Sequence, residues 1–449
     1  MKLLFISLGC DKNLVDTEVM LGILQGHKFE FTDDEAEADV IVINTCCFIH
    51  DAKEESIQTI LDMAQYKQAA GNGGKCRALL VAGCLAQRYA QEIRTEIPEV
   101  DAIVGTTAYD KIAEALEAVL AGQEGDRLAD IEELPAVEEQ RVVTTGGYYA
   151  YLKIAEGCDK HCTYCIIPKL RGHYRSVPME RLVREAKQLV ENGVKELILV
   201  AQETTLYGQD LYGKKMLPKL LQELCKIEGL FWIRLLYCYP EEIDDKLIQV
   251  IREEDKICNY LDMPIQHASD AILKRMGRRT NKRQLIDIIE KLRTDIPDIC
   301  LRTTLITGFP GETHQEHQEL LDFVDELEFD RLGVFTYSQE EDTPAAGYSA
   351  QLSEEVKQSR QADLMELQQE ISFAHAQDMV GRVLDAFVEG KVTDEAAYAA
   401  RTYMDAPNVD GLLFIQTQRE LMSGDMVKVR VIGAYEYDLI GELCDESAE

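Results

Sequence analysis

Basic side chains and long apolar stretches are scarce in this sequence. Of its 449 residues, 47 are Lys or Arg against 81 Asp or Glu, so the net charge is −34. A surface this acidic repels phosphate backbones, which argues against a non-specific nucleic-acid-binding protein and favours a basic protein as partner. No apolar run approaches the roughly 20 residues of a membrane span. We therefore expect no membrane association, and tRNA is an unfavourable partner.

We also expect no secretion signal at the N-terminus. The apolar stretch in the opening MKLLFISLGC covers only residues 3–8 before Asp11 and Lys12. A signal-peptide core needs about 7–15 apolar residues. We therefore expect a cytoplasmic protein, whose thiols stay reduced. The thirteen cysteines of the chain then indicate metal or redox chemistry rather than disulfides.

Apolar stretches alternate with helical patterns over residues 1–121. The expected strands are 2–8, 39–44, 77–82 and 101–104, and the expected helices are 14–25, 51–70, 86–96 and 110–121. Continuous apolar strands separated by helices are typical of a buried parallel sheet. The sequence therefore predicts an α/β protein with an N-terminal parallel-sheet domain at 1–121 and an acidic linker at 122–143.

A second alternation of strands and helices follows within residues 144–375. Its expected strands are 149–154, 196–201, 232–237, 260–263, 300–307 and 332–337, and its helices include 179–192 and 314–327. One long helix is expected after it, over residues 354–379. Six strand–helix repeats predict a full or partial (β/α) barrel, whose chemistry lies at the carboxyl ends of the strands. Trp232, the only tryptophan, lies in one of these strands and is expected in the core.

The C-terminal segment, 376–445, changes to short strands punctuated by turn residues. The expected strands are 383–389, 397–403, 411–415, 426–432 and 439–443. Five short strands in about 70 residues predict a small five-stranded β-barrel.

Three cysteines, Cys158, Cys162 and Cys165, form a C-x3-C-x2-C triplet in GCDKHCTYC, just after the first barrel strand. Three thiolates on one short loop can bind three irons of a cubane cluster and leave the fourth iron open to another ligand. The alternative is a structural zinc site with His161 or His173 as fourth ligand.

A second set of cysteines follows three strands of the N-terminal sheet. Cys10, Cys46 and Cys84 end the stretches FISLGC, VIVINTC and LLVAGC. Because parallel strands end at the same edge, the three thiols are expected to converge on a second three-cysteine metal site. Cys47 adjoins Cys46, and the sequence leaves open which of the two faces the metal. The remaining cysteines are expected to be apolar fillers.

The triplet GCDKHCTYC resembles the signature of radical S-adenosylmethionine (SAM) enzymes. Together with SLGCDKNLVDTE, INTCCFI and AGCLAQRY, it resembles the methylthiotransferases over essentially the whole chain. The resemblance implies an N-terminal methylthiotransferase domain, a radical-SAM core at 144–375 and a C-terminal TRAM barrel at 376–445. These three parts agree with the segments predicted above.

The resemblance also implies two [4Fe-4S] clusters and SAM as cofactors. The cluster on Cys158, Cys162 and Cys165 would bind SAM and cleave it to a radical that abstracts hydrogen. The cluster on Cys10, Cys46 and Cys84 would hold the sulfur, and a second SAM would supply the methyl group. Further SAM contacts are expected where predicted barrel strands end, at Gln202, Gln266, Ser269 and Gly308, with ordinary loop residues as the alternative.

Several stretches resemble the RimO branch of the family, which modifies the β-carbon of an aspartyl residue in small-subunit ribosomal protein twelve. They are NTCCFIHDAKEESI, AYLKIAEGCDKHCTYCIIPKLRGHYRS, RLLYCYPEEI, YLDMPIQHASDAILKRMGRR and LRTTLITGFPGET. Asp11 stands where that branch usually has Pro, and Cys47 stands where it frequently has Gly. The implied partners are the ribosomal protein, free or within its subunit, and donors of electrons and of sulfur.

Two other functions stay open from the sequence. One is a tRNA-adenosine methylthiotransferase of the same fold, and the other is a non-catalytic iron–sulfur or zinc protein that binds RNA. The C-terminal segment 376–449 has six Lys or Arg against fifteen Asp or Glu, a poor basis for gripping RNA. The most basic run of the core is expected to be a solvated face or to dock ribosomal RNA or an acidic loop; it comprises Lys274, Arg275, Arg278 and Arg279.

Overall fold

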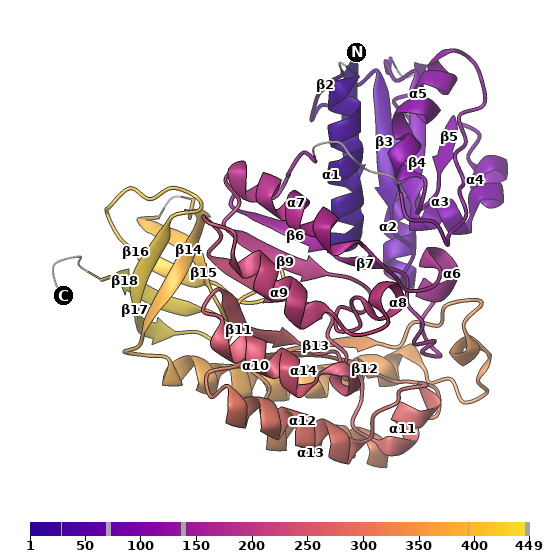
Figure 1. Ribbon diagram of the computed structural model, residues 1–449. Helices are drawn as coiled ribbons and strands as arrows, with labels where there is room; N and C mark the ends of the chain where they lie inside the picture. The colour runs from indigo at the N-terminus through magenta and orange to yellow at the C-terminus, as the bar shows by residue number, and fades with distance from the viewer. Residues whose placement is uncertain (28, 69–72, 136–140, 394, 445–449) are drawn as a thin grey trace. The chain divides into compact units, whose positions relative to one another are not determined.

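The computed structural model describes residues 1–27, 29–68, 73–135, 141–393 and 395–444 (Figure 1). The chain divides into two compact units. The first unit comprises Met1–Thr144, Ala155–Val177 and Ser338–Ala346, and the second comprises Thr145–Ile154, Pro178–Tyr337 and Gly347–Glu449.

A parallel sheet forms the centre of the first unit. Its strands are β1 (Lys2–Ser7), β2 (Glu30–Phe31), β3 (Val40–Thr45), β4 (Ala78–Gly83) and β5 (Ala102–Val104). They lie side by side in the order β2-β1-β3-β4-β5, and every pairing is parallel. The predicted N-terminal parallel sheet is therefore confirmed.

Helices cover both faces of this sheet, which explains why β3 and β4 are buried along their whole length. The helices are α1 (Asp11–Gly26), α2 (His50–Ala64), α3 (Cys84–Arg88), α4 (Ala90–Glu96), the short η2 (Tyr109–Lys111) and α5 (Ile112–Leu120). Apolar side chains of α1 and α5 pack on one face. Those of α2, α3 and α4 pack on the other.

Two local predictions for this region differ from the structure. The expected helix 86–96 is interrupted at Tyr89, whose backbone (φ −119°, ψ 33°) leaves the helical region. The expected helix 51–70 ends at Ala64, and residues 69 and 70 lie outside the described residues. Within the expected linker, the backbone of Arg127 bonds to Ile103 and Gly105 beside β5. Residues 136–140 of this linker lie outside the described residues.

The cysteine triplet also belongs to the first unit. It lies in a loop between two strands that pair antiparallel, β7 (Ala155–Glu156) and β8 (Arg175–Ser176), and a short helix, α6 (Ile167–Arg171), follows it. Ile166 and Leu170 extend the apolar cluster that α2, α3 and α4 form on the sheet.

The second unit is built on a six-stranded parallel sheet. Its strands are β6 (Tyr149–Lys153), β9 (Glu196–Val200), β10 (Trp232–Leu235), β11 (Ile257–Asp262), β12 (Cys300–Thr307) and β13 (Arg331–Thr336). The strands lie in the order β13-β12-β11-β10-β9-β6 and do not close into a ring. Of the two predicted forms, a full or a partial (β/α) barrel, the structure therefore has the partial one. The helices of this unit are α7 (Met179–Glu191), α8 (Gln209–Tyr212), α9 (Leu217–Cys225), η3 (Pro240–Glu242), α10 (Asp245–Glu253), α11 (Asp270–Arg275), α12 (Lys282–Asp295), α13 (His314–Leu327) and α14 (Glu354–Asp378). The short η4 (Pro344–Gly347) spans the boundary between the two units.

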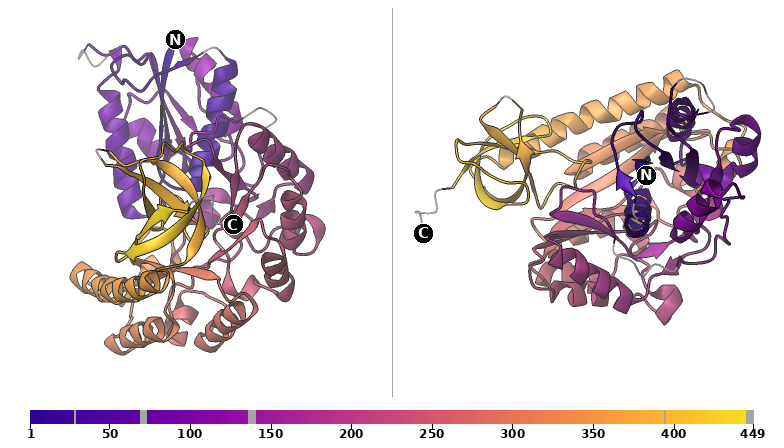
Figure 2. Two further views of the ribbon diagram at one scale, coloured as in Figure 1. Left: turned by 90° about the vertical axis from the view of Figure 1, so that its left-hand side faces the viewer. Right: turned by 90° about the horizontal axis from the view of Figure 1, so that it is seen from above.

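A closed five-stranded barrel follows α14, as predicted (Figure 2). Its strands are β14 (Val383–Lys391), β15 (Ala397–Thr402), β16 (Leu413–Gln416), β17 (Met426–Ala434) and β18 (Leu439–Leu443). Trp232 packs edge-on against Phe387 of the barrel at a ring distance of 4.7 Å and is 9% exposed, which confirms its expected place in the core.

Buried ion pairs join this barrel to the parallel sheet. Arg234 of β10 donates to Glu196 of β9 at 2.8 Å, and Arg401 of β15 donates to the other oxygen of Glu196 at 2.7 Å. All three side chains are at most 1% exposed. Because an unpaired buried charge is costly, the three residues hold β15 against the amino ends of β9 and β10.

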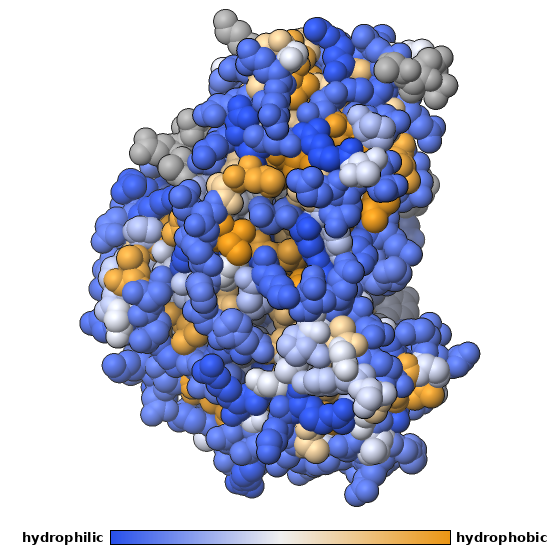
Figure 3. Space-filling view, turned by 90° about the vertical axis from the view of Figure 1, so that its right-hand side faces the viewer, coloured by the Kyte–Doolittle hydropathy of each residue, from blue (hydrophilic) through white to orange (hydrophobic). Residues whose placement is uncertain are grey.

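Hydrophilic residues cover most of the face seen in Figure 3, and apolar residues show there only in small groups. This agrees with the 29% of residues that are charged. Among the described residues, no helix combines the length and the apolar character required to cross a bilayer.

Candidate functional site

The three strand-end cysteines lie at neighbouring strand ends of the first unit. Strand β3 pairs with β1 on one side and with β4 on the other, with Thr45 opposite Gly83. Cys46 and Cys84 directly follow β3 and β4, and Cys10 directly precedes α1. A Cβ placed on Gly9, whose φ is +90°, would lie 2.6 Å from Cβ and 3.0 Å from Sγ of Cys46. The loop that carries Cys10 therefore packs directly against Cys46.

Electrostatics show that these thiols influence one another. Burial, together with the neighbouring Cys84 and Cys10, raises the pKa of Cys46 to about 12. Burial also raises the pKa of Cys84, which the charge of Arg171 opposes. Buried thiols of this kind become thiolates when a bound cation compensates their charge. The donor set therefore fits an iron–sulfur cluster.

Asn13, which the sequence analysis missed, joins the three cysteine loops. Its side-chain amide donates to the carbonyls of Leu8 and Thr45 at 3.1 and 2.9 Å, and its Oδ1 lies 3.9 Å from Sγ of Cys84. Asn13 is fully buried. The only signal in the sequence is its place in the first turn of the helix after Cys10.

Cys46 and Cys47 have different surroundings. Cys47 is fully buried in the apolar cluster of α2, α3 and α4, and this burial raises its pKa. Cys46 instead lies beside Gly9 and Cys10. This arrangement favours Cys46 as the partner of Cys10 and Cys84.

The thiols of the triplet are also close to one another. Cys158 and Cys162 are 7% and 5% exposed, and burial together with Cys162 and Cys158 raises the pKa of Cys165. Gly157, with φ +79°, leaves no room for a side chain because a Cβ there would lie 2.0 Å from the carbonyl oxygen of His173.

A zinc site that uses His173 finds little support in this geometry. The imidazole of His173 is 69% exposed and its Nδ1 lies 2.7 Å from Asp159. Within the described residues, no group of three or more His, Cys, Asp or Glu is placed to hold one metal ion. Thiolates on a cubane bind separate irons and need not converge on one point.

The four predicted SAM contacts lie in the second unit, after β9, β11 and β12. Gln266 has φ +75°, and its backbone pairs with β12 through Thr304 and Ile306. Ser269 is buried and directly precedes α11. Gly308 has φ +70°, and a Cβ there would lie 2.3 Å from Cγ of Lys357, so its small size admits α14. Gln202 follows β9 by two positions. SAM binding by these residues stays a prediction.

Glu312, a further residue that the sequence analysis missed, joins two of these loops. It accepts hydrogen bonds from the amides of Gly308 and Phe309 at 2.5 and 3.1 Å. Burial alone would raise its pKa, but the opposing influence of His267, His317 and Arg360 lowers it to about 2. His267 follows Gln266, so Glu312 connects the loops after β11 and β12.

The basic run after β11 is only partly a solvated face. The guanidinium of Arg278 is 4.2 Å from the ring centre of Tyr239 and donates to the carbonyl of Pro264. Lys274 and Arg279 are exposed.

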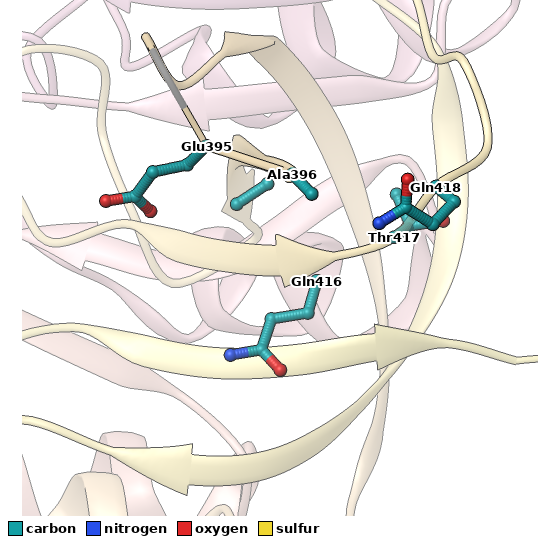
Figure 4. A pocket seen from close by; sticks show the side chains of 6 residues that line it. Glu395, Ala396, Gln416, Thr417 and Gln418 are labelled. Atoms are coloured by element: carbon teal, nitrogen blue, oxygen red, sulfur yellow. The ribbon is translucent and has the colours of Figure 1, made fainter.

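A surface groove of about 560 Å³ lies on the barrel. It is lined by Glu395, Ala396, Ala397, Gln416, Thr417 and Gln418 (Figure 4). None of the candidate site residues lines it.

Family models match three parts of the chain. They are the uncharacterized protein family UPF0004 at residues 2–105, the radical SAM superfamily at 152–324 and the TRAM domain at 380–444. Among solved structures, the radical SAM methyltransferase TsrM from Kitasatospora setae has a TM-score of 0.54 at 13% identity, covering 77% of this chain and 73% of TsrM. This likeness supports the radical-SAM fold.

Curated relatives match the chain over its whole length. The ribosomal protein uS12 methylthiotransferase RimO of Lachnoclostridium phytofermentans is 64% identical over 98% of this chain and 99% of its own. The protein of the same name from Clostridioides difficile is 49% identical over the full length of both. Radical SAM proteins use SAM and an iron–sulfur cluster, which gives this chain its cofactors. The chain belongs to the RimO family of radical-SAM methylthiotransferases.

Proposed function

We propose that this chain adds a methylthio group to the β-carbon of an aspartyl residue of ribosomal protein uS12, the small-subunit protein twelve. The observation that carries the proposal is the 64% identity to a RimO protein over nearly the whole of both chains. It is supported by two sets of three cysteines, each brought together within the first unit.

We assign two [4Fe-4S] clusters to these cysteines. Cys158, Cys162 and Cys165 would hold one, and Cys10, Cys46 and Cys84 the other. When bound, the clusters and SAM supply the electron, the radical, the sulfur and the methyl group of the reaction. The chain itself orients the thiolates through Asn13 and Gly9 and would position SAM through Gln202, Gln266, Ser269 and Gly308.

The charge of the chain supports a basic protein as substrate. The C-terminal segment 376–449 has six basic against fifteen acidic residues, which favours approach of a basic ribosomal protein over tRNA. The functional parts would be the domain at 1–121, the linker at 122–143, the core at 144–375 and the barrel at 376–445. The reaction also requires an electron donor and a sulfur donor, and we place it in the cytoplasm.

Mass spectrometry of uS12 tests this proposal. The chain is expressed in a bacterial host that lacks its own RimO, and uS12 is isolated from the ribosomes. We expect the mass of one methylthio group on an aspartyl residue, and none when Cys158 is replaced by Ala. Unmodified uS12 together with methylthioadenosine in the tRNA of the same cells would assign the chain to the tRNA-modifying branch instead.

A further inference from the structure

Arg171 is a buried cation that reaches from the triplet loop to the other set of cysteines. It is the last residue of α6, six positions after Cys165, and its side chain is 2% exposed. Its Nη2 donates to Oδ1 of Asn13 at 2.5 Å and lies 3.5 Å from Sγ of Cys84. All these residues belong to the first unit.

Two carboxylates hold this guanidinium in place. Nη1 of Arg171 donates to Asp16 of α1 at 2.9 Å and to Glu156 of β7 at 3.1 Å. Both carboxylates are almost fully buried. Burial opposes the charge of Arg171, but Cys84, Glu156 and Asp16 together raise its pKa well above the usual value. The planar fork of arginine allows these contacts at once, which a lysine cannot reproduce.

The contact with sulfur adds to two ion pairs that already compensate the charge of Arg171. Asp16 and Glu156 already compensate the charge of Arg171, yet its second nitrogen is directed at Cys84 and Asn13 rather than at a further carboxylate. A cationic donor beside a thiolate sulfur withdraws electron density from the iron that the thiolate binds. Hydrogen bonds to cluster sulfurs and nearby charge are established determinants of cluster potential.

We propose that Arg171 is a positioning residue that orients the sulfur of Cys84 and raises the reduction potential of the cluster on Cys10, Cys46 and Cys84. The inference rests on the proposed function, because it requires that this second cluster exists. A reduced cluster carries one more negative charge than the oxidised cluster, so a nearby cation stabilises the reduced form. Removal of the cation therefore lowers the potential, and removal of the neighbouring negative charge of Asp16 raises it.

The test uses the full chain with Cys158, Cys162 and Cys165 replaced by Ala, which leaves only the cluster in question. Iron is counted after anaerobic reconstitution, and the midpoint potential is measured by a redox titration followed by electron paramagnetic resonance. We expect a lower potential in R171Q, a smaller decrease in R171K and an increase in D16N. The control is R94Q, because Arg94 bonds to Asp126 and to backbone carbonyls without touching a cysteine.

R171Q removes the ion pairs of Arg171 with two buried carboxylates and can fail to fold, so R171K and D16N provide the test in that event. Equal potentials in R171K, D16N and the parent chain would overturn the inference while leaving the proposed function intact. A parent chain that binds no iron at Cys10, Cys46 and Cys84 would instead contradict the second cluster itself.

Discussion

Gly9 shows how one residue shapes the N-terminal cysteine site. Its backbone is left-handed and its missing side chain lets the loop of Cys10 lie against Cys46. An alanine there would meet Cβ of Cys46 at 2.6 Å in a backbone conformation that costs roughly 1–3 kcal/mol for residues with a side chain.

Gly9→Ala is therefore expected to lower the melting temperature by several degrees and to reduce iron binding at Cys10, Cys46 and Cys84. Gly26→Ala is the matched control, because Gly26 is the last residue of α1, the helix that follows the Gly9 loop, and no atom lies near its Cβ position. The control should change stability by less than about 1 kcal/mol. Equal iron content and melting temperature in both variants would contradict this role of Gly9. Iron content and differential scanning calorimetry provide the two measurements.

Glu312 predicts a pH dependence of stability. Its folded-state pKa is lowered to about 2, below the roughly 4.3 of an unfolded glutamate. The ionised carboxylate therefore stabilises the fold fully above about pH 4.3, and this contribution is lost as the pH falls toward 2. Glu312→Gln should be less stable than the wild type at pH 7, and the difference should shrink between pH 5 and about pH 3. Thermal unfolding of both proteins across this pH range measures the difference in stability. A difference that stays constant with pH would contradict the lowered pKa of Glu312.

The sequence reveals cysteines more readily than the residues that hold them. Cys10, Cys46 and Cys84 stand out because each follows an apolar strand, a pattern visible within ten residues. Asn13 and Arg171 are separated by 158 positions and meet only in the folded protein. No local pattern marks such a pair. Glu312 was missed for the same reason, since its partner His267 lies on a different loop.

Among elements, strands were predicted better than the ends and interruptions of helices. Buried parallel strands are continuous apolar runs, so β3, β4 and β12 fall within one residue of the predicted ranges. The break at Tyr89 lies in a segment that reads as one amphipathic helix. The strand β2 was missed because its two residues are exposed at the sheet edge and carry no apolar pattern.

The contact between β15 and the ends of β9 and β10 gives a prediction for the terminal barrel. Arg401→Ala removes a cation that is 1% exposed and leaves Glu196 with Arg234 alone. Breaking a buried pair costs about 3–5 kcal/mol, so we expect a marked loss of stability. Lys428→Ala is the control, since its pair with Asp385 is 66% and 53% exposed and should contribute less than about 1 kcal/mol. Urea unfolding of both variants measures the two losses in the free energy of unfolding. Equal losses would contradict the conclusion that buried ion pairs hold the barrel against the sheet.

For the whole molecule, the compact units do not follow the order of the chain. Segments 155–177 and 338–346 pack with the N-terminal sheet, although the sequence places them within the core domain. The reason lies in side-chain contacts: Ile166 and Leu170 join the apolar cluster of the sheet, and Arg88 bonds to the backbone of Glu341. As a result, both sets of cysteines belong to one unit.

The central claim is that these two sets of cysteines perform separate parts of one reaction, and one assay tests it directly. Reconstituted wild type, C158A/C162A/C165A and C10A/C46A/C84A are incubated with SAM, reductant and uS12. 5′-Deoxyadenosine and methylthio-uS12 are quantified in the same samples. The wild type should bind about eight irons, as expected for two four-iron clusters, and form both products. The first variant should form neither product, and the second should form 5′-deoxyadenosine alone. Methylthio-uS12 from the second variant would contradict the account.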